Sequence, residues 1–235
     1  MKPEISVVIL CYQAGERIRG FVDKTIKLLG SAVPSWEIIL VANYLDNSND
    51  ITPQVVKEIS ARNQNVKFVA RVKEGMMGWD ARSGLREAAG MYICLIDGDE
   101  QMPPEDIINV YRKIVGEGLD FVTTYRLTRC DGAMRKIISS VYNLLFKLLF
   151  PEINVRDVNS KPKIFRTEAY AKMNLISDDW FIDAEMVIQA KKLKFKTGEV
   201  PTEFFKCKYR KSFVKVGAIF EFMGNLLRAR FRRFF

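Results

Sequence analysis

The sequence predicts an α/β protein with a mostly parallel central sheet flanked by helices. Short apolar runs rich in β-branched residues alternate with longer amphipathic segments along the first half of the chain. This alternation is typical of β-α-β units, whose strands are parallel and buried on both faces. The chain has 235 residues and a hydrophobic content of 48%, enough for one substantial core. We expect one folded domain, residues 1–208, and a basic amphipathic C-terminal tail, residues 209–235.

The expected elements follow the chain in order. Apolar runs of strand length occupy residues 5–10, 37–41, 66–70, 91–97 and 120–124, and residues 195–205 predict one or two strands around Pro201. Amphipathic spacing predicts helices over residues 15–29, 52–62, 79–89, 104–115, 134–150 and 182–193. Thr52 and Pro53 are suitable as N-cap and first residue of the second helix, and Gly90 ends the third.

One stretch, MYICLIDGDEQMPPE at residues 91–105, ends a buried strand in Asp97 and Asp99, followed by Gln101. Ligands of open parallel sheets bind beyond the carboxyl ends of the strands, so we expect a site here. Two carboxylates and a carboxamide at alternate positions offer hard oxygen donors, which suit Mg²⁺ or Mn²⁺ bridging to phosphates. The alternative is an acidic turn that caps a helix beginning near Pro104. The position at the end of a buried strand favours a metal-diphosphate site.

The composition excludes several kinds of chemistry. The chain has no histidine, which excludes Ser-His-Asp triads, Cys-His pairs and imidazole metal sites. Its 4 cysteines are far apart and lack a CxxC spacing, as expected of reduced structural residues in a cytoplasmic protein. The formal net charge of +9 indicates anionic partners such as sugar nucleotides, lipid phosphates or nucleic acid.

Two segments bear on localisation. The N-terminus lacks the pattern of a signal peptide, and no run approaches the ~20 apolar residues needed to span a bilayer. Residues 137–150 and 213–235 mix Phe, Leu and Ile with Lys and Arg, as do helices that lie in an anionic membrane interface. The alternative for the first segment is a core helix. We expect a cytoplasmic protein that is peripheral at the inner face of the membrane, attached directly or through a membrane partner protein.

The order of these motifs resembles glycosyltransferase family 2, whose members have the GT-A fold. Within the family it resembles the branch of dolichyl-phosphate mannose synthase and bacterial polyprenyl-phosphate glycosyltransferases. The resemblance covers residues 6–212 and rests on SVVILCYQ, GLREAAGMYICLIDGDEQMPPE, MRKIISSVYN, DVNSKPKIFR and GEVPTEFF. DGDEQMPPE is similar to the Asp-x-Asp-x-Gln-x-Pro-Pro-Glu pattern of that branch, which is far more specific than two spaced aspartates.

The resemblance implies a nucleotide-sugar site with a metal ion bound by Asp97, Asp99 and Gln101, of which Asp99 is the most direct ligand. The residues matched to donor contacts are Cys11, Gln13, Glu16, Asn43, Asp46, Gly78, Asp97 and Gly98. The second strand ends in Ala-Asn-Tyr where the family usually has an Asp pair. The sequence therefore does not decide between a UDP-linked and a GDP-linked donor.

The resemblance also implies an acceptor site for a polyprenyl phosphate. Arg126, Arg135 and Lys163 match basic positions of the family's acceptor half, and Arg126 joins Asp99 as a candidate catalytic residue. A phosphate attacks as an existing oxyanion and needs no base, whereas a sugar hydroxyl needs a carboxylate to remove its proton. Asp183 falls where hydroxyl-directed relatives keep that base, although capping of a helix N-terminus explains it equally well.

We therefore expect metal-dependent, inverting transfer of one sugar from a nucleotide sugar to a polyprenyl phosphate, by one in-line displacement. One alternative keeps the fold and transfers to a glycan hydroxyl with Asp183 as base. Another is a non-catalytic glycosyltransferase-like binding protein, suggested by the altered acids after the first two strands. Nucleic acid is not an expected partner, because it would leave DGDEQ unexplained. Lys161 stands where the family usually has Gly. The family pattern therefore does not predict the backbone conformation of the acceptor loop in this chain.

Overall fold

The computed structural model describes residues 2–129, 133–205 and 216–231. Within these residues a 7-stranded sheet has the order β3-β2-β1-β4-β6-β5-β7. The strands are β1 (Ile5–Leu10), β2 (Trp36–Val41), β3 (Val66–Val69), β4 (Tyr92–Asp97), β5 (Phe121–Arg129), β6 (Lys163–Arg166) and β7 (Thr197–Phe204). β6 is antiparallel to β4 and β5, and the other pairs are parallel, which confirms the predicted mostly parallel sheet.

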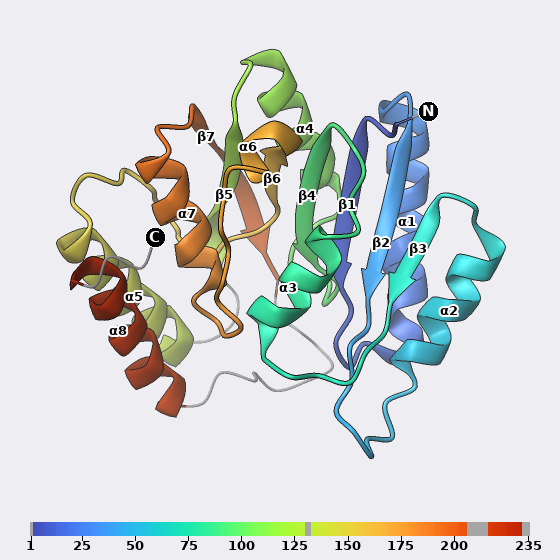
Figure 1. The fold of residues 1–235 in the computed structure, drawn as a ribbon, viewed down its shortest axis with the longest axis horizontal. Coiled ribbons are helices and arrows are strands. Elements are labelled where there is room, and N and C mark those ends of the chain that lie inside the picture. Colours follow the sequence, from blue (N-terminus) through green and yellow to red (C-terminus); the bar gives the residue numbers. More distant parts are fainter. Residues whose placement is uncertain (1, 130–132, 206–215, 232–235) are drawn as a thin grey trace.

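Helices cover both faces of the sheet (Figure 1). They are α1 (Ile18–Ala32), α2 (Thr52–Arg62), α3 (Met77–Leu85), α4 (Glu105–Gly116), α5 (Ala133–Leu149), α6 (Thr167–Tyr170), α7 (Ile182–Lys192) and α8 (Val216–Phe231), with a 3₁₀ turn, η1 (Gly15–Arg17), before α1. Successive strand residues point to opposite faces, so Val7 and Ile9 join the core beneath α1, α2 and α4. Val8 and Leu10 join the core beneath α3, α5, α7 and α8.

Element boundaries differ from the predicted ones where tertiary contacts intervene. Thr52, expected as an N-cap, is instead the first residue of α2, and its hydroxyl accepts a hydrogen bond from the Gly15 backbone N–H at 2.9 Å. β5 extends further than predicted, which places Arg126 on the strand. β7 continues through Pro201, as an edge strand can, because the missing N–H need not serve a second neighbour.

The cysteines and the apolarity of the helices are two further properties of the described residues. Cys11 and Cys94 are buried free thiols, whereas Cys130 and Cys207 lie outside the described residues. In the part of the chain that the structure describes, no helix combines the length and apolarity needed to cross a membrane.

The strand directions determine which residues meet at the site. β1, β2, β4 and β5 run the same way, so their carboxyl ends share one edge of the sheet. β6 runs the opposite way, and the loop that precedes it, residues 157–162, therefore arrives at the same edge. The residues after β4 and the residues before β6 are consequently neighbours.

Candidate active site

The carboxyl end of β4 is the centre of the candidate site. Asp97 is the last residue of β4 and lies opposite Leu10 of β1, and the N–H of Gly98 donates to the Leu10 carbonyl at 2.8 Å. A Cβ on Gly98 would lie 2.6 Å from Ile18 Cδ1 and 3.1 Å from the Leu10 oxygen. Glycine therefore lets this turn pack directly against the first strand and helix, which fixes the backbone that carries Asp97 and Asp99.

The turn after β4 is stabilised by its own polar groups. Glu100 has a φ of 60°, and Asp99 Oδ1 accepts a hydrogen bond from the Gln101 backbone N–H at 3.1 Å. Gln101 Nε2 donates to the Phe205 carbonyl at 3.1 Å, and the Phe205 N–H donates to the Gln101 carbonyl at 2.8 Å. The segment that carries the predicted metal ligands is thus attached to the residue that follows β7.

The predicted donor residues that follow β1 have different environments. Cys11 is buried, its thiol donates to the Ile9 carbonyl at 3.2 Å, and burial raises the pKa of the thiol. Gln13 is exposed and has a φ of 53°. Glu16 is exposed and pairs with Arg19 at 2.6 Å. The assignment of these three residues to the donor stays a prediction.

Asn43, after β2, belongs to a buried polar cluster. Asn43 Nδ2 donates to Asp80 Oδ1 at 2.9 Å and to Ser83 Oγ at 3.0 Å, and its Oδ1 accepts from the Arg71 backbone N–H at 3.0 Å. Asp80 also forms an ion pair with Lys73. Burial raises the pKa of Asp80, although the Lys73 ammonium opposes this. The cluster joins β2 to α3, and its members are too far apart in the chain for a spacing pattern to reveal it.

Asp46 and Gly78 lie between Asn43 and Asp80 of that cluster in the chain. Asp46 is exposed and accepts a hydrogen bond from the Asn47 N–H at 3.1 Å. The Gly78 N–H donates to the Asp179 carbonyl at 3.0 Å, and a Cβ there would lie 2.4 Å from the Ser177 carbonyl oxygen. Gly78 therefore allows α3 to pack closely on the loop before α7, and a donor contact of either residue stays a prediction.

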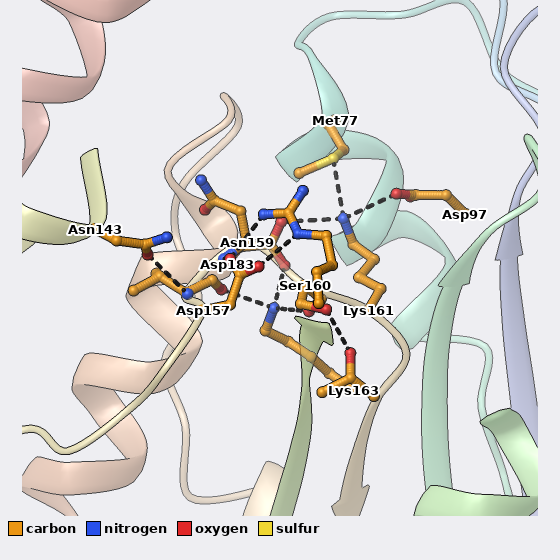
Figure 2. A network of polar contacts seen from close by, with 12 residues as sticks. Met77, Asp97, Asn143, Asp157, Asn159, Ser160, Lys161, Lys163 and Asp183 are labelled. Carbon is orange, nitrogen blue, oxygen red and sulfur yellow. Dashed lines mark hydrogen bonds and ion pairs between the residues drawn. The ribbon is translucent and has the colours of Figure 1, made fainter. Parts of the chain in front are cut away.

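A chain of alternating charges links β4 to the acceptor half (Figure 2). Lys161 Nζ lies 3.2 Å from Asp97 Oδ2 and 3.0 Å from Asp183 Oδ2, and Lys163 Nζ lies 2.9 Å from Asp183 Oδ1. Lys163 is fully buried and also donates to the carbonyls of Val158 at 2.9 Å and Ser160 at 2.6 Å. Lys163 thus supports the loop before β6 from beneath, and its predicted contact with an acceptor phosphate stays a prediction.

The protonation states follow from this arrangement. Burial alone would raise the pKa of Asp183, but the ammonium groups of Lys161 and Lys163 outweigh burial and lower it. Burial likewise favours the neutral form of Lys161, but Asp183 and Asp97 together raise its pKa. Burial lowers the pKa of Lys163 against the opposing effect of Asp183. Asp183 is therefore an ionised counterion of the lysines and a weak base.

Arg126 extends the acceptor side of the site. Its Nε and Nη2 donate to the two carboxylate oxygens of Asp157 at 2.5 and 2.7 Å, and its guanidinium carbon lies 5.0 Å from the centre of the Phe204 ring. The side chains of Arg126 and Asp157 are 8% and 10% exposed, so this is a largely buried bidentate pair. Arg135 belongs to α5, but its side chain lies outside the described residues.

The structure therefore joins some of the predicted residues and not others. It connects Asp97, Asp183 and Lys163 through Lys161, which sequence reasoning treated only as a departure from the family pattern. It also shows that Arg126 forms an ion pair with Asp157, a residue that no sequence argument singled out. The signal that could have found Asp157 is its place in the DVNSKPKIFR motif, where an acid precedes two lysines.

The oxygen donors at the end of β4 suit a divalent ion. Asp97 and Asp99 offer carboxylates and Gln101 a carboxamide oxygen, and the side chain of Asp97 is 24% exposed at the edge of the sheet. Among the described residues no three His, Cys, Asp or Glu side chains gather as a metal-binding group. A bound ion would therefore need further oxygen ligands from substrate phosphates and water, as Mg²⁺ sites commonly do.

Comparison with solved structures shows the fold. The glucosyl-3-phosphoglycerate synthase of Mycobacterium tuberculosis, in a crystal with Mn²⁺, UDP and phosphoglyceric acid, is 18% identical with a TM-score of 0.70. The match covers 97% of this chain and 78% of that one. The same protein crystallised with UDP gives a TM-score of 0.71.

Sequence comparison gives curated relatives and a family. An undecaprenyl-phosphate 4-deoxy-4-formamido-L-arabinose transferase of Pectobacterium atrosepticum is 29% identical over 145 residues, 61% of this chain and 43% of that protein. Its counterpart in Salmonella choleraesuis is 30% identical over 146 residues, with the same coverage. The matched region thus spans less than half the length of these relatives. The model of glycosyl transferase family 2 matches residues 6–175, and the chain belongs to this family.

Proposed function

We propose that this protein transfers one sugar from a nucleotide sugar to a polyprenyl phosphate, with inversion, at a membrane surface. Family membership supports glycosyl transfer, and the names of the curated relatives support an undecaprenyl-type phosphate as acceptor. The observation that carries the choice of acceptor is the position of Asp183 between two buried lysines.

The donor would bind at the carboxyl end of β4. Asp97, Asp99 and Gln101 would hold Mg²⁺ or Mn²⁺, and the Mn²⁺ and UDP in the crystals of the fold neighbour favour Mn²⁺ and a UDP-linked sugar over a GDP-linked one. When bound, such an ion neutralises the charge that develops on the departing nucleotide diphosphate. The chain itself contributes a turn whose backbone is fixed by Gly98 and by the contacts of Gln101 with Phe205.

Among the described residues of the acceptor side, the carboxylate predicted as a base is Asp183. Asp183 is ionised and compensated by Lys161 and Lys163, which lowers its pKa and makes it a poor proton acceptor. A hydroxyl nucleophile would require such an acceptor, whereas a phosphate monoester arrives as an oxyanion. Arg126, oriented by Asp157, with Arg135 and Lys163, would supply the cations that a phosphate needs.

Membrane contact would come from α5 and α8, which pack against each other. In α5, Val141, Leu144 and Leu148 are 46%, 58% and 68% exposed, and their spacing places them on one face. In α8, Leu227 and Phe231 are 45% and 77% exposed, four residues apart on one face. Exposed apolar stripes beside basic residues suit a peripheral position on an anionic bilayer. We propose the inner face of the cytoplasmic membrane, with or without a membrane partner protein.

The test is a transfer assay with the full chain. UDP- and GDP-linked sugars, with Mn²⁺ or Mg²⁺, are offered with a short polyprenyl phosphate or with a free glycan, and the products are identified by mass spectrometry. We expect a single sugar on the lipid phosphate. Asp99→Asn should lower kcat about 100- to 1,000-fold, because it removes the most direct ligand of the metal.

The assay has one control variant and two outcomes that would favour the alternatives. Asp23→Asn, on the exposed face of α1, should leave the rate unchanged. Transfer to the glycan alone would replace the lipid phosphate by a hydroxyl acceptor and restore Asp183 as the base. Nucleotide binding without transfer to either acceptor would leave a glycosyltransferase-like binding protein.

A further inference from the structure

The ammonium of Lys161 occupies an unusual place, because it lies between the donor carboxylate Asp97 and the acceptor half. Its Nζ is 3.2 Å from Asp97 Oδ2, 3.0 Å from Asp183 Oδ2 and 3.4 Å from Met77 Sδ. The side chain is only 3% exposed. Figure 2 shows it entering from the loop before β6, with Asp97 on one side and Asp183 on the other.

The charge of Lys161 is shared between Asp97 and Asp183. Asp183 lies between two lysines, and Lys163, which is fully buried at 2.9 Å, also compensates it. Two lysines thus serve two aspartates, and the charges balance because Lys161 compensates part of the charge of Asp97. Without Lys161, the carboxylates of Asp97 and Asp183 would face each other with no ammonium between them, beside the place where an anionic diphosphate must bind.

The geometry also fixes the position of the ammonium. Three contacts, two carboxylate oxygens and a thioether sulfur, account for the three N–H donors of a lysine. Asp183 comes from α7, Asp97 from β4 and Met77 from α3, so three separate elements hold the cation at the edge of the sheet. A charge held in this way is preorganised, and ligand binding need not order it.

We propose that Lys161 is a resident cation of the donor site, which positions Asp97 and supplies part of the charge compensation for the nucleotide diphosphate. This rests on the proposed function, because it assumes that the donor binds at Asp97. Two consequences follow. The wild-type protein binds nucleotide diphosphate without a divalent ion, and Lys161 weakens the binding of a divalent ion at Asp97, because like charges repel.

The experiment measures UDP and GDP binding by isothermal titration calorimetry, in Mn²⁺ and in excess EDTA, and Mn²⁺ binding without nucleotide. The full-length proteins are the wild type, Lys161→Met, Lys161→Gln, and Lys172→Met as a control on an exposed lysine. Lys161→Gln removes the charge but keeps an N–H donor for the neighbouring carboxylates, and Asp183 keeps Lys163 as its partner. It therefore serves as the second variant if Lys161→Met unfolds.

We expect measurable nucleotide binding by the wild type in EDTA. Lys161→Met should weaken this binding about tenfold or more while Mn²⁺ alone binds about tenfold more tightly, and Lys161→Gln should show the same pair of opposite changes. Lys172→Met should match the wild type. A lysine that only held the loop in place would not change the two affinities in opposite directions.

Other results would overturn the inference. Wild-type binding that occurs with Mn²⁺ and is absent in EDTA would show that Lys161 does not compensate the diphosphate, and the proposed function would stand. Unchanged nucleotide and Mn²⁺ affinities in both variants would reduce Lys161 to a structural ion pair. No nucleotide binding under any condition would remove the proposed function together with the inference.

Discussion

Charged side chains have different environments in the two halves of the candidate site. In the donor half, around the end of β4, the polar groups of the turn bond to nearby backbone, as Asp99 bonds to the Gln101 N–H. In the acceptor half, around β5 and β6, charged side chains are buried and paired with one another, as Arg126 is with Asp157 and Lys163 with Asp183. The turn after β4 presents carboxylates at the edge of the sheet, whereas β5, β6 and the loop before β6 hold their cations in a buried network.

This difference shows how a cation-rich site can be assembled without unfolding the protein. Buried charges of one sign repel each other and lose their hydration, so they persist only with counterions in good geometry. Asp157 and Asp183 supply those counterions. The acidic residues of the acceptor half thus stabilise its basic ones, whereas Asp97 and Asp99 of the donor half are the proposed ligands of a metal ion.

The largest expected effect on stability comes from breaking a buried pair in the acceptor half. Asp157→Ala leaves the Arg126 guanidinium buried without its bidentate partner, and should lower the free energy of unfolding by about 3–5 kcal/mol. In the donor half, Lys24 and Glu105 pair at 2.7 Å with side chains 55% and 46% exposed. Lys24→Met should therefore cost about 0–1 kcal/mol. Urea denaturation measures both, and equal losses would contradict the contrast between the halves.

A smaller effect tests the packing of the donor half. A Cβ at Gly84 of α3 would lie 2.4 Å from Val41 Cγ2 and 2.5 Å from Val8 Cγ1, so Gly84→Ala should cost about 1–3 kcal/mol. Gly20 of α1 is exposed and a Cβ there would meet nothing within 4 Å. Gly20→Ala should instead stabilise the protein by up to about 1 kcal/mol, because alanine favours a helix. Thermal and urea unfolding of both variants would show whether the signs differ as expected.

The smallest effect is on the pH dependence of stability, and it should have opposite signs in the two halves. The pKa of Asp183 lies below the ordinary 3.8, so between the two values the unfolded chain binds more protons and stability rises with pH. The pKa of Asp80 lies above 3.8, so in the window above 3.8 the folded chain binds more protons and stability falls as pH rises.

Urea unfolding at a series of pH values measures these two slopes. Asp183→Asn should flatten the rise of stability below pH 3.8, and Asp80→Asn should flatten the fall just above it. If both variants changed the slope of stability against pH in the same direction, the pKa values of Asp183 and Asp80 would not be shifted in opposite directions.

Much of the donor half could be predicted from the sequence because its elements are local. Ile5–Leu10 was predicted with the observed bounds, and the turn after β4 follows directly from the apolar run that precedes it. The hydrophobic pattern also predicted the sheet and its helices, because burial on both faces leaves continuous apolar runs.

The acceptor half was less predictable because its partners are distant in the chain. The family pattern singled out Lys163 and Arg126 as phosphate-binding cations, but their counterions Asp183 and Asp157 are set by tertiary structure. Lys161 was noted only as a departure from glycine, since no local spacing indicates that its ammonium reaches Asp97. In the donor half, Asn43 likewise bonds to Asp80, which lies on another element.

The antiparallel strand β6 has a further consequence, for the order of folding. β6 lies between β4 and β5 in the sheet, although it follows β5 in the chain. While the chain is being synthesised, β1 to β4 can pair with one another, but β4 must keep one edge unpaired until β5, α5 and the loop before β6 have been made. An unpaired edge of a buried strand is prone to association with other chains. Assembly of the acceptor half is therefore the step at which this protein depends most on rapid folding.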